Sequence, residues 1–213
     1  MWTWTLEWSD IRDDIVIGSC PMTTADIDVI RTGTGASALL SLQHDECRAH
    51  FGVDYEDHRR HGEGLGLAVV NAPMRDFDPE EQRERLPAAV FHLHALLARG
   101  HRVYVYCTAG INRAPLTVLG YLTFVEGLSP DEAIAAIRRG RPGAEPYWEA
   151  WHGCRRDLLD RHRPAVEARA WALAQNDPHR SSEDNWFLAE AQVLREVCTW
   201  SAPPVARPDS GGP

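Results

Sequence analysis

Several features that would assign this chain to a particular class of protein are missing. No apolar run is long enough to cross a membrane, and the N-terminal stretch MWTWTLEWSD has neither the basic start nor the apolar core of a signal peptide. The five cysteines are odd in number, widely spread and without a CxxC pair, which argues against a disulfide framework or a zinc site. We therefore expect a cytoplasmic protein with reduced thiols and no membrane partner.

Acidic residues also outnumber basic ones, 31 to 22. The net charge of −9 disfavours sequence-independent binding to nucleic acid, because such binding needs a positive surface. An anionic ligand must therefore be held by a local arrangement of donors. The 213 residues and the apolar share of 44% suit one ordinary domain with a packed core and a small appendage.

Short apolar runs alternate with helical patterns in the first two thirds of the chain. Strands are predicted at 14–19, 36–43, 66–73 and 101–107, and a His-rich stretch at 44–64 is predicted as loop with a short helix. Helices are predicted at 23–33, capped by Thr23 or Thr24, at 78–100, capped by Asp78 in a capping box with Glu81, at 113–126 and at 129–140. This alternation predicts an α/β fold with a mainly parallel central sheet covered by helices on both faces.

The C-terminal quarter has a different pattern. Strand signals end near residue 145, and 146–163 is predicted as a helix that packs on the main domain. Two amphipathic helices follow at 164–175 and 181–197, and they are similar to a small helix–turn–helix module of bacterial proteins. We therefore expect a main domain at 1–163, a small helical module at 164–200 and a disordered, Pro/Gly-rich tail at 201–213.

One cysteine stands where a predicted strand meets a predicted helix. In the stretch VYVYCTAGINRAP, Cys107 ends the strand and Arg113 follows six positions later. Between them, Gly110 permits a close approach of the backbone, and Asn112 is one of the few non-glycine residue types that tolerate left-handed geometry. Such a loop can direct successive N–H groups at one anion, and the helix start adds the positive end of its dipole. The predicted phosphate-binding residues are Thr108, Ala109, Gly110, Ile111, Asn112 and Arg113.

These residue types suit one kind of chemistry. The guanidinium of Arg113 matches two phosphate oxygens, and a positive cluster favours the thiolate form of a neighbouring cysteine. Cys107 would then attack phosphorus, which predicts cleavage of phosphomonoesters through a phosphocysteine. Two alternatives stay open: Cys107 is a small buried hydrophobe at the end of a strand, or the loop binds an anion without turnover.

The same stretch carries a resemblance to a known family. A Cys-x5-Arg loop after a strand is the signature of cysteine-dependent phosphatases. The chain resembles, over roughly residues 8–160, the glucan phosphatase branch of the dual-specificity phosphatases, the branch of laforin and the plant starch-excess enzymes. The matching runs are, in order, GSCPMTTADIDVI, LLSLQHD, HFGVD, RDFDP, RLPAAV, RVYVYCTAGINRAP and YLTFVEGLSPDEA.

The resemblance implies roles for three catalytic residues in a dual-specificity phosphatase fold. Cys107 matches the nucleophile, Arg113 the phosphate-binding arginine, and Asp76 the general acid that protonates the leaving alkoxide. The alternative for Asp76 is an acidic residue that interacts with a helix N-terminus, for which Asp78 is better placed. Positioning and charge stabilisation are sufficient for both steps, so neither a metal nor another cofactor is expected.

The resemblance also implies a substrate, a phosphorylated α-glucan of the glycogen or starch kind. Phe77, Phe51 and Trp8 match aromatic positions that contact sugar rings, although aromatic side chains are more often part of the core. Two positions depart from the family pattern, because Tyr106 replaces a usual histidine and Asn112 replaces a usual glycine. The alternatives are therefore a dual-specificity phosphatase acting on phosphotyrosine, phosphoserine or phosphothreonine, and a weakly active binder of phospho-ligands or glucan.

Overall fold

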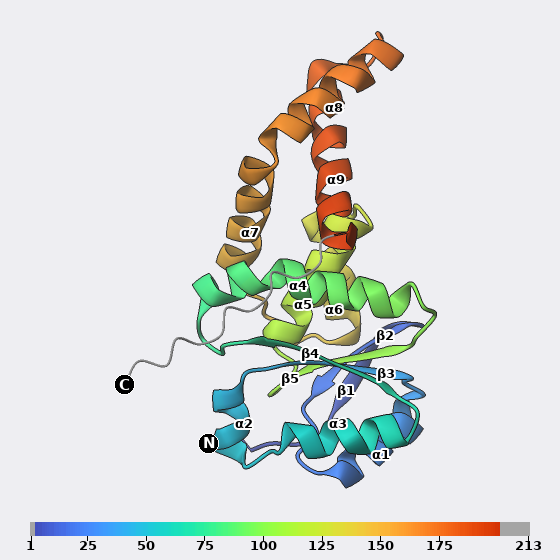
Figure 1. Ribbon diagram of the computed structural model, residues 1–213, viewed down its shortest axis with the longest axis vertical. Coiled ribbons are helices and arrows are strands. Elements are labelled where there is room, and N and C mark those ends of the chain that lie inside the picture. Colours follow the sequence, from blue (N-terminus) through green and yellow to red (C-terminus); the bar gives the residue numbers. More distant parts are fainter. Residues whose placement is uncertain (1–2, 201–213) are drawn as a thin grey trace.

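A sheet of five strands runs through the middle of the described part of the protein, residues 3–200 of a computed structural model (Figure 1). Its strand order is β1-β2-β5-β3-β4. All neighbouring strands are parallel except β1, which pairs with β2 in the antiparallel direction. The strands are β1 (Trp8–Arg12), β2 (Ile15–Ser19), β3 (Ala38–Gln43), β4 (Ala68–Met74) and β5 (Val103–Cys107). The predicted α/β fold with a mainly parallel sheet is confirmed.

The edge strand β1 is the strand that the sequence patterns did not predict. It has a neighbour on one side alone, and its residues are partly exposed, so it lacks the continuous apolar run of a buried parallel strand. Its pairing with β2 starts at Trp8 opposite Gly18, and the register shifts between Asp10 and Arg12. Its short, irregular pairing leaves little periodicity in the sequence.

Helices cover both faces of the sheet (Figure 1). On one face lie α1 (Thr24–Thr34) and α3 (Tyr55–Gly64), and on the other lie α4 (Pro79–Leu97) and α5 (Arg113–Gly120). α6 (Pro130–Gly140) packs against α5 and the edge strand β1. This arrangement leaves the carboxyl end of β5 open between the layers, where α5 begins.

The side chains of β5 alternate between the two layers. Val103, Val105 and Cys107 belong to the larger core, which β5 shares with α4 and α5. Tyr104 and Tyr106 belong to the smaller core beneath α1. Because successive strand residues point to opposite faces, Tyr106 is directed away from the layer that Cys107 joins.

Several helices begin at the residue that the sequence indicates. Thr23 caps α1 and Ser129 caps α6, and each takes part in a capping box. Asp78 caps α4 by accepting a hydrogen bond from the N–H of Glu81. The predicted return bond within this last capping box is wrong, because the Glu81 carboxylate accepts from the N–H of Arg75 instead.

Two segments differ from their predicted form. The His-rich stretch at 44–64 folds into two helices, α2 (Asp45–Phe51) and α3, with a left-handed glycine after α2. The predicted helix at 113–126 divides into α5 and the π-helix η1 (Tyr121–Val125). The hydroxyl of Thr123 donates to Leu119 O at 2.8 Å in this region, a bond that competes with the α-helical N–H for the same carbonyl.

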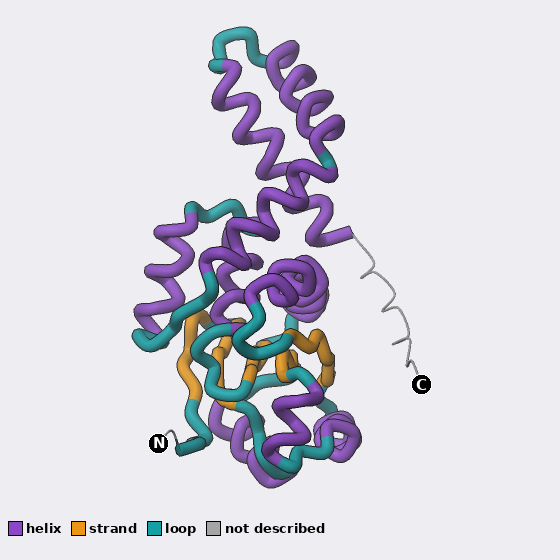
Figure 2. The backbone as a smooth tube through the Cα atoms, turned by 90° about the vertical axis from the view of Figure 1, so that its left-hand side faces the viewer, coloured by secondary structure: helices purple, strands orange, loops and turns teal. Residues whose placement is uncertain are grey.

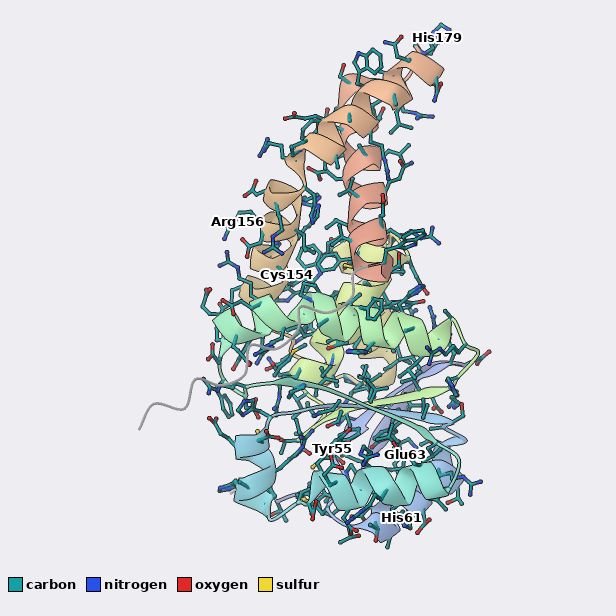
Figure 3. The ribbon with its side chains drawn as sticks, viewed as in Figure 1. Tyr55, His61, Glu63, Cys154, Arg156 and His179 are labelled. Carbon is teal, nitrogen blue, oxygen red and sulfur yellow. The ribbon has the colours of Figure 1, made fainter. Side chains whose placement is uncertain are left out.

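Three helices complete the described chain: α7 (Trp148–Arg161), α8 (Arg163–Asn176) and α9 (Ser182–Trp200). α8 and the first part of α9 form a hairpin that projects from the sheet layers, with His179 at its tip (Figures 2 and 3). Further along α9, Leu194 and Cys198 pack into the main core. The tail predicted at 201–213 lies outside the described residues. Within residues 3–200, no helix is long and apolar enough to span a membrane.

Candidate functional site

A short loop joins β5 to α5 at the carboxyl end of the parallel strands. Cys107 is the last residue of β5 and Arg113 is the first residue of α5. Gly110 has a φ of 66°, in the left-handed region, and a Cβ atom at this position would lie 2.6 Å from Gly18 O. A side chain is therefore excluded at Gly110 both by backbone conformation and by the neighbouring strand.

Four successive carbonyl groups of this loop accept hydrogen bonds from residues outside it. The pairs are Cys20 N to Thr108 O (3.2 Å), Arg141 Nη2 to Ala109 O (2.7 Å), Arg141 Nε to Gly110 O (2.6 Å) and Glu145 N to Ile111 O (2.8 Å). A trans peptide directs its N–H opposite to its C=O. The following N–H groups, from Ala109 to Asn112, are thus directed away from these donors, as an anion nest requires.

Arg141 is the main support of the loop. It is buried between α6 and the loop, and its Nη2 also donates to Glu7 Oε1 at 2.7 Å. One guanidinium thereby fixes two adjacent peptides and remains paired with a carboxylate. Hydrogen bonds from a charged donor are stronger than neutral ones, so this support is rigid.

Arg113 lies beneath the cavity with 1% of its surface exposed. Its Nη1 donates to Met74 O at 3.1 Å, and its Nη2 donates to Thr108 Oγ1 at 3.0 Å and to Asp76 Oδ2 at 2.6 Å. Its Nε has no hydrogen-bond partner among the described residues. Burial by itself would lower the pKa of Arg113, but the negative charges of Cys107 and Asp76 outweigh it and raise that pKa. The guanidinium is therefore a permanent cation with one free donor.

Asp76 and Phe77 belong to the segment between β4 and α4. Asp76 reaches the loop through its ion pair with Arg113. Phe77 has a φ of 57° and is the one non-glycine residue with positive φ in the described chain. The residue is 82% exposed. The backbone thus holds an aromatic ring in solvent directly beside a carboxylate, a conformation that is unfavourable for a bulky residue without other constraints.

A cavity of about 620 Å³ opens over the loop. One wall comes from α2, a second from the Asp76 segment, and the floor from the loop itself. The residues that line it are Glu46, Cys47, His50, Phe51, Asp76, Phe77, Cys107, Thr108, Ala109, Ile111, Asn112 and Arg113. The structure therefore brings together Cys107, Arg113, Asp76, Phe51, Phe77 and most of the predicted loop residues around one space.

Two sequence-based expectations differ from the structure. Trp8 does not reach the cavity, because its indole packs against α1, where a Cβ on Gly33 would lie 2.8 Å from the ring. Asn112 has a φ of −113°, so it does not use the left-handed conformation that the sequence suggested. Gly110 is the residue of the loop that adopts it.

The sequence patterns missed several residues of this site. Arg141 and the backbone of Glu145 lie about thirty positions beyond the loop in the segment RPGAE, which carries no catalytic motif. Cys47 lies beside Arg113, whose Nη1 donates to its Sγ at 3.4 Å. The described residues contain no cluster of three or more metal-ligating side chains.

Tyr106, which stands where related loops have histidine, lies on the other face of the sheet. Its ring packs 5.9 Å from that of Tyr104, and it is almost fully buried. Burial raises the pKa of Tyr106, while a hydrogen bond with Ser41 acts in the opposite direction. The phenol is therefore a neutral part of the smaller core and does not line the cavity.

Known proteins are similar to this sequence over much of its length. The family model described as "Dual specificity phosphatase, catalytic domain" matches residues 43–153. The amyloplastic phosphoglucan phosphatase DSP4 of Castanea sativa is 33% identical over 168 residues, which cover 78% of this chain and 44% of that protein. Laforin of Mus musculus is 30% identical over 147 residues, which cover 64% of this chain and 44% of laforin. The chain thus spans less than half the length of these curated relatives.

Solved structures show the same fold. The crystal structure of PTPMT1 superposes with a TM-score of 0.57 at 21% identity, covering 70% of this chain and 91% of that one. The crystal structure of human DUSP28 gives a TM-score of 0.51 at 20% identity, covering 70% of this chain and 90% of that one. At these identities the likeness concerns the fold.

Proposed function

The chain belongs to the dual-specificity phosphatase family, and we propose on this basis that it hydrolyses phosphomonoesters through a phosphocysteine, with a phosphorylated α-glucan as substrate. One observation carries the proposal. Cys107, Arg113 and Asp76 line one cavity, over a loop whose carbonyl groups are bound by residues outside it. These are a nucleophile, an oxyanion-binding cation and an acid within one substrate's reach.

The reaction follows from these positions. The Cys107 thiolate attacks phosphorus while the bond from phosphorus to the ester oxygen breaks, and Asp76 gives its proton to the departing alkoxide. The loop amides and Arg113 stabilise the charge on the three remaining oxygens. Water then attacks the phosphocysteine, Asp76 accepts a proton from that water, and inorganic phosphate leaves as the thiolate is restored.

The ion pair between Asp76 and Arg113 links binding to catalysis. Asp76 Oδ2 accepts from Arg113 Nη2 at 2.6 Å, and a bound phosphate competes for the same guanidinium. A dianionic phosphate forms the stronger partner for an arginine fork, so its arrival releases the carboxylate. Asp76 is then free to take up the proton that the leaving alkoxide needs.

Charge and shape support a sugar substrate. The cavity lining contains the carboxylates of Glu46 and Asp76 but, of the described residues, one arginine, Arg113. A second arginine near it, Arg75, is paired with Glu46 at 3.4 Å. Such a cavity repels a leaving group that carries further negative charge, while the rings of Phe51 and Phe77 suit the apolar faces of neutral sugars. The relatives named as phosphoglucan phosphatases support the same choice.

We place the catalytic unit at residues 1–163 and a helical module at 164–200, in a cytoplasmic protein. The separate small core of Val166, Ala189 and Val193 within the hairpin supports the division. The five cysteines, all free thiols, support a reducing compartment.

Phosphate release tests the proposal. Solubilised phosphoglucan, phosphotyrosine and phosphothreonine peptides, and an aryl phosphate are compared as substrates, with Cys107→Ser as the inactive control. We expect turnover of the phosphoglucan that is lost in Cys107→Ser. Asp76→Asn should lose less activity on the aryl phosphate than on the phosphoglucan, because an aryl leaving group needs less protonation. Turnover of aryl phosphate and phosphopeptides without the glucan would favour a protein phosphatase. Binding of phosphoglucan without turnover would favour a binding protein.

A further inference from the structure

The side chain of Asn112 connects the end of the loop to the segment between α6 and α7. Its Nδ2 donates to Glu145 O at 3.0 Å, and the N–H of Glu145 donates to Ile111 O at 2.8 Å. Two bonds of opposite direction therefore join the same two short segments, as neighbouring rungs of a β-ladder do. Asn112 also lines the cavity, so this pair of bonds lies directly beside the space over Cys107.

We propose that Asn112 is a positioning residue of the oxyanion site, whose side chain fixes the peptide between Ile111 and Asn112. A single bond from Glu145 N to Ile111 O leaves this peptide free to turn about the bond direction. The second bond, from Asn112 Nδ2, defines its plane. Because the carbonyl is held on one side, the N–H of Asn112 is held on the other, toward a bound phosphate.

The conformation of Asn112 allows this role. Its φ of −113° is negative, so the left-handed conformation that favours glycine is not needed here. Glycine at this position would remove the tie and add backbone freedom. Aspartate would place a carboxylate oxygen against Glu145 O and close to the bound anion. The amide of asparagine supplies the donor without adding a negative charge.

The other polar atom of the side chain is consistent with a constrained amide. Asn112 Oδ1 is buried and has no hydrogen-bond partner among the described residues. A buried acceptor without a partner is unfavourable, so the side chain gains nothing from this orientation except the bond from Nδ2 to Glu145 O. Reversal of the amide would set two oxygens against each other. The orientation is therefore determined by the tie to Glu145.

Binding of tungstate, a tetrahedral oxyanion, tests the proposal by calorimetry on the full chain. The variants are Asn112→Ala and Asn112→Asp, with Asn176→Ala as the matched control, since Asn176 is exposed at the end of α8. We expect the Kd for tungstate to rise about threefold to tenfold in Asn112→Ala, the effect of one neutral hydrogen bond, and further in Asn112→Asp. Asn176→Ala should bind as the unaltered chain does.

Alkylation of Cys107 by iodoacetamide gives a second readout. Because the oriented N–H groups stabilise negative charge, the pH profile of the alkylation rate should move to higher pH in Asn112→Ala. A purely structural bond would lower the melting temperature and leave both the tungstate Kd and the alkylation profile unchanged. That combination, or equal effects in Asn112→Ala and Asn176→Ala, would overturn the proposal.

This inference rests on the proposed function for the identity of the natural ligand, but neither measurement needs turnover. If the unaltered chain binds tungstate and hydrolyses no phosphomonoester, the proposed function fails. The Kd values of the Asn112 variants for tungstate still test the positioning role in that case. If the chain hydrolyses phosphomonoesters and the Asn112 variants bind tungstate normally, the positioning role fails alone. If the unaltered chain binds no tungstate, no oxyanion site exists and the positioning role is refuted.

Discussion

Replacement of Arg141 by methionine separates the support of the phosphate loop from the groups that contact phosphate. Methionine keeps a long apolar stem but has no donor. The change removes the bonds to Ala109 O and Gly110 O, at 2.7 Å and 2.6 Å, and the ion pair with Glu7. No group proposed to touch the substrate is altered.

The expected effect follows from the two lost carbonyl bonds. A hydrogen bond from a charged group contributes about 1.5–3 kcal/mol, and the carbonyls are left without a donor, so the free energy of unfolding should fall by about 3 kcal/mol. For a chain of this size that lowers the melting temperature by about 6–12 °C. The same two peptides direct N–H groups at the anion. Losing that orientation should weaken transition-state binding by a similar amount, which is roughly a hundredfold in kcat/KM.

Hydrolysis of an aryl phosphate well below the melting temperature measures the catalytic effect. Arg139→Met is the matched control, because Arg139 lies exposed near the end of α6, the helix that Arg141 follows. Arg141→Lys, which keeps the charge but not the fork, should fall between the two. If Arg141→Met melts at a lower temperature but keeps kcat/KM within threefold of the unaltered chain, the carbonyl bonds do not position the loop.

Three further predictions follow from other contacts. Burial raises the pKa of Cys20 and of Cys198 to about 12 and that of Cys154 well above its usual value, so iodoacetamide at pH 8 should label Cys107 or Cys47 first. Peptide mass spectrometry that found Cys154, on α7 near α9 (Figure 3), labelled first would contradict this. Gly110→Ala should lower the free energy of unfolding by about 1–2 kcal/mol because of the left-handed φ, and by more because of the contact with Gly18 O. Phosphate release should fall at least tenfold. Urea unfolding and turnover equal to those of the unaltered chain would refute this prediction. Arg83 donates to both carboxylate oxygens of Asp157 at 2.6 Å, and this hydrogen bonding lowers the pKa of Asp157. The pair should therefore stabilise the fold fully at pH values above the unfolded-state pKa of about 3.9. This stabilisation should be lost as the pH falls through the lower pKa of the folded state. Asp157→Asn should therefore lower stability by roughly 0.5–1 kcal/mol at pH 7 and by nothing in strong acid, as measured by denaturant unfolding at both pH values.

Local signals predicted much of the framework. A run of apolar residues ending at Cys107, a glycine and a helix start are enough to place β5, its loop and α5 in order, because each depends on near neighbours in the chain. The caps Thr23, Asp78 and Ser129 mark helix starts for the same reason. The expected parallel sheet also followed from alternation along the chain. The roles of Cys107, Arg113 and Asp76 stay predictions until turnover is measured.

Pairings between distant segments could not be predicted from such local signals. β1 depends on its pairing with β2. The Glu81 carboxylate accepts a hydrogen bond from the N–H of Arg75, in the segment before α4, and not from the N-cap residue of its own helix. Trp8 matched an aromatic position by order in the sequence, yet strand pairing directs it to α1 and away from the cavity. Such outcomes depend on which surfaces meet, a property with no fixed spacing in sequence.

Near neighbours in the chain are enough to specify the strand that ends in a thiol, the turn through Gly110 and the helix that begins at Arg113. Contacts between distant segments bring Arg141 and Glu145 to the carbonyls of that loop, and Asp76 to the guanidinium of Arg113. The two kinds of outcome differ because the interactions behind them act over different distances along the chain. Dihedral preferences and caps act over a few residues, whereas an anion site needs charges and dipoles that converge in space from segments far apart along the chain.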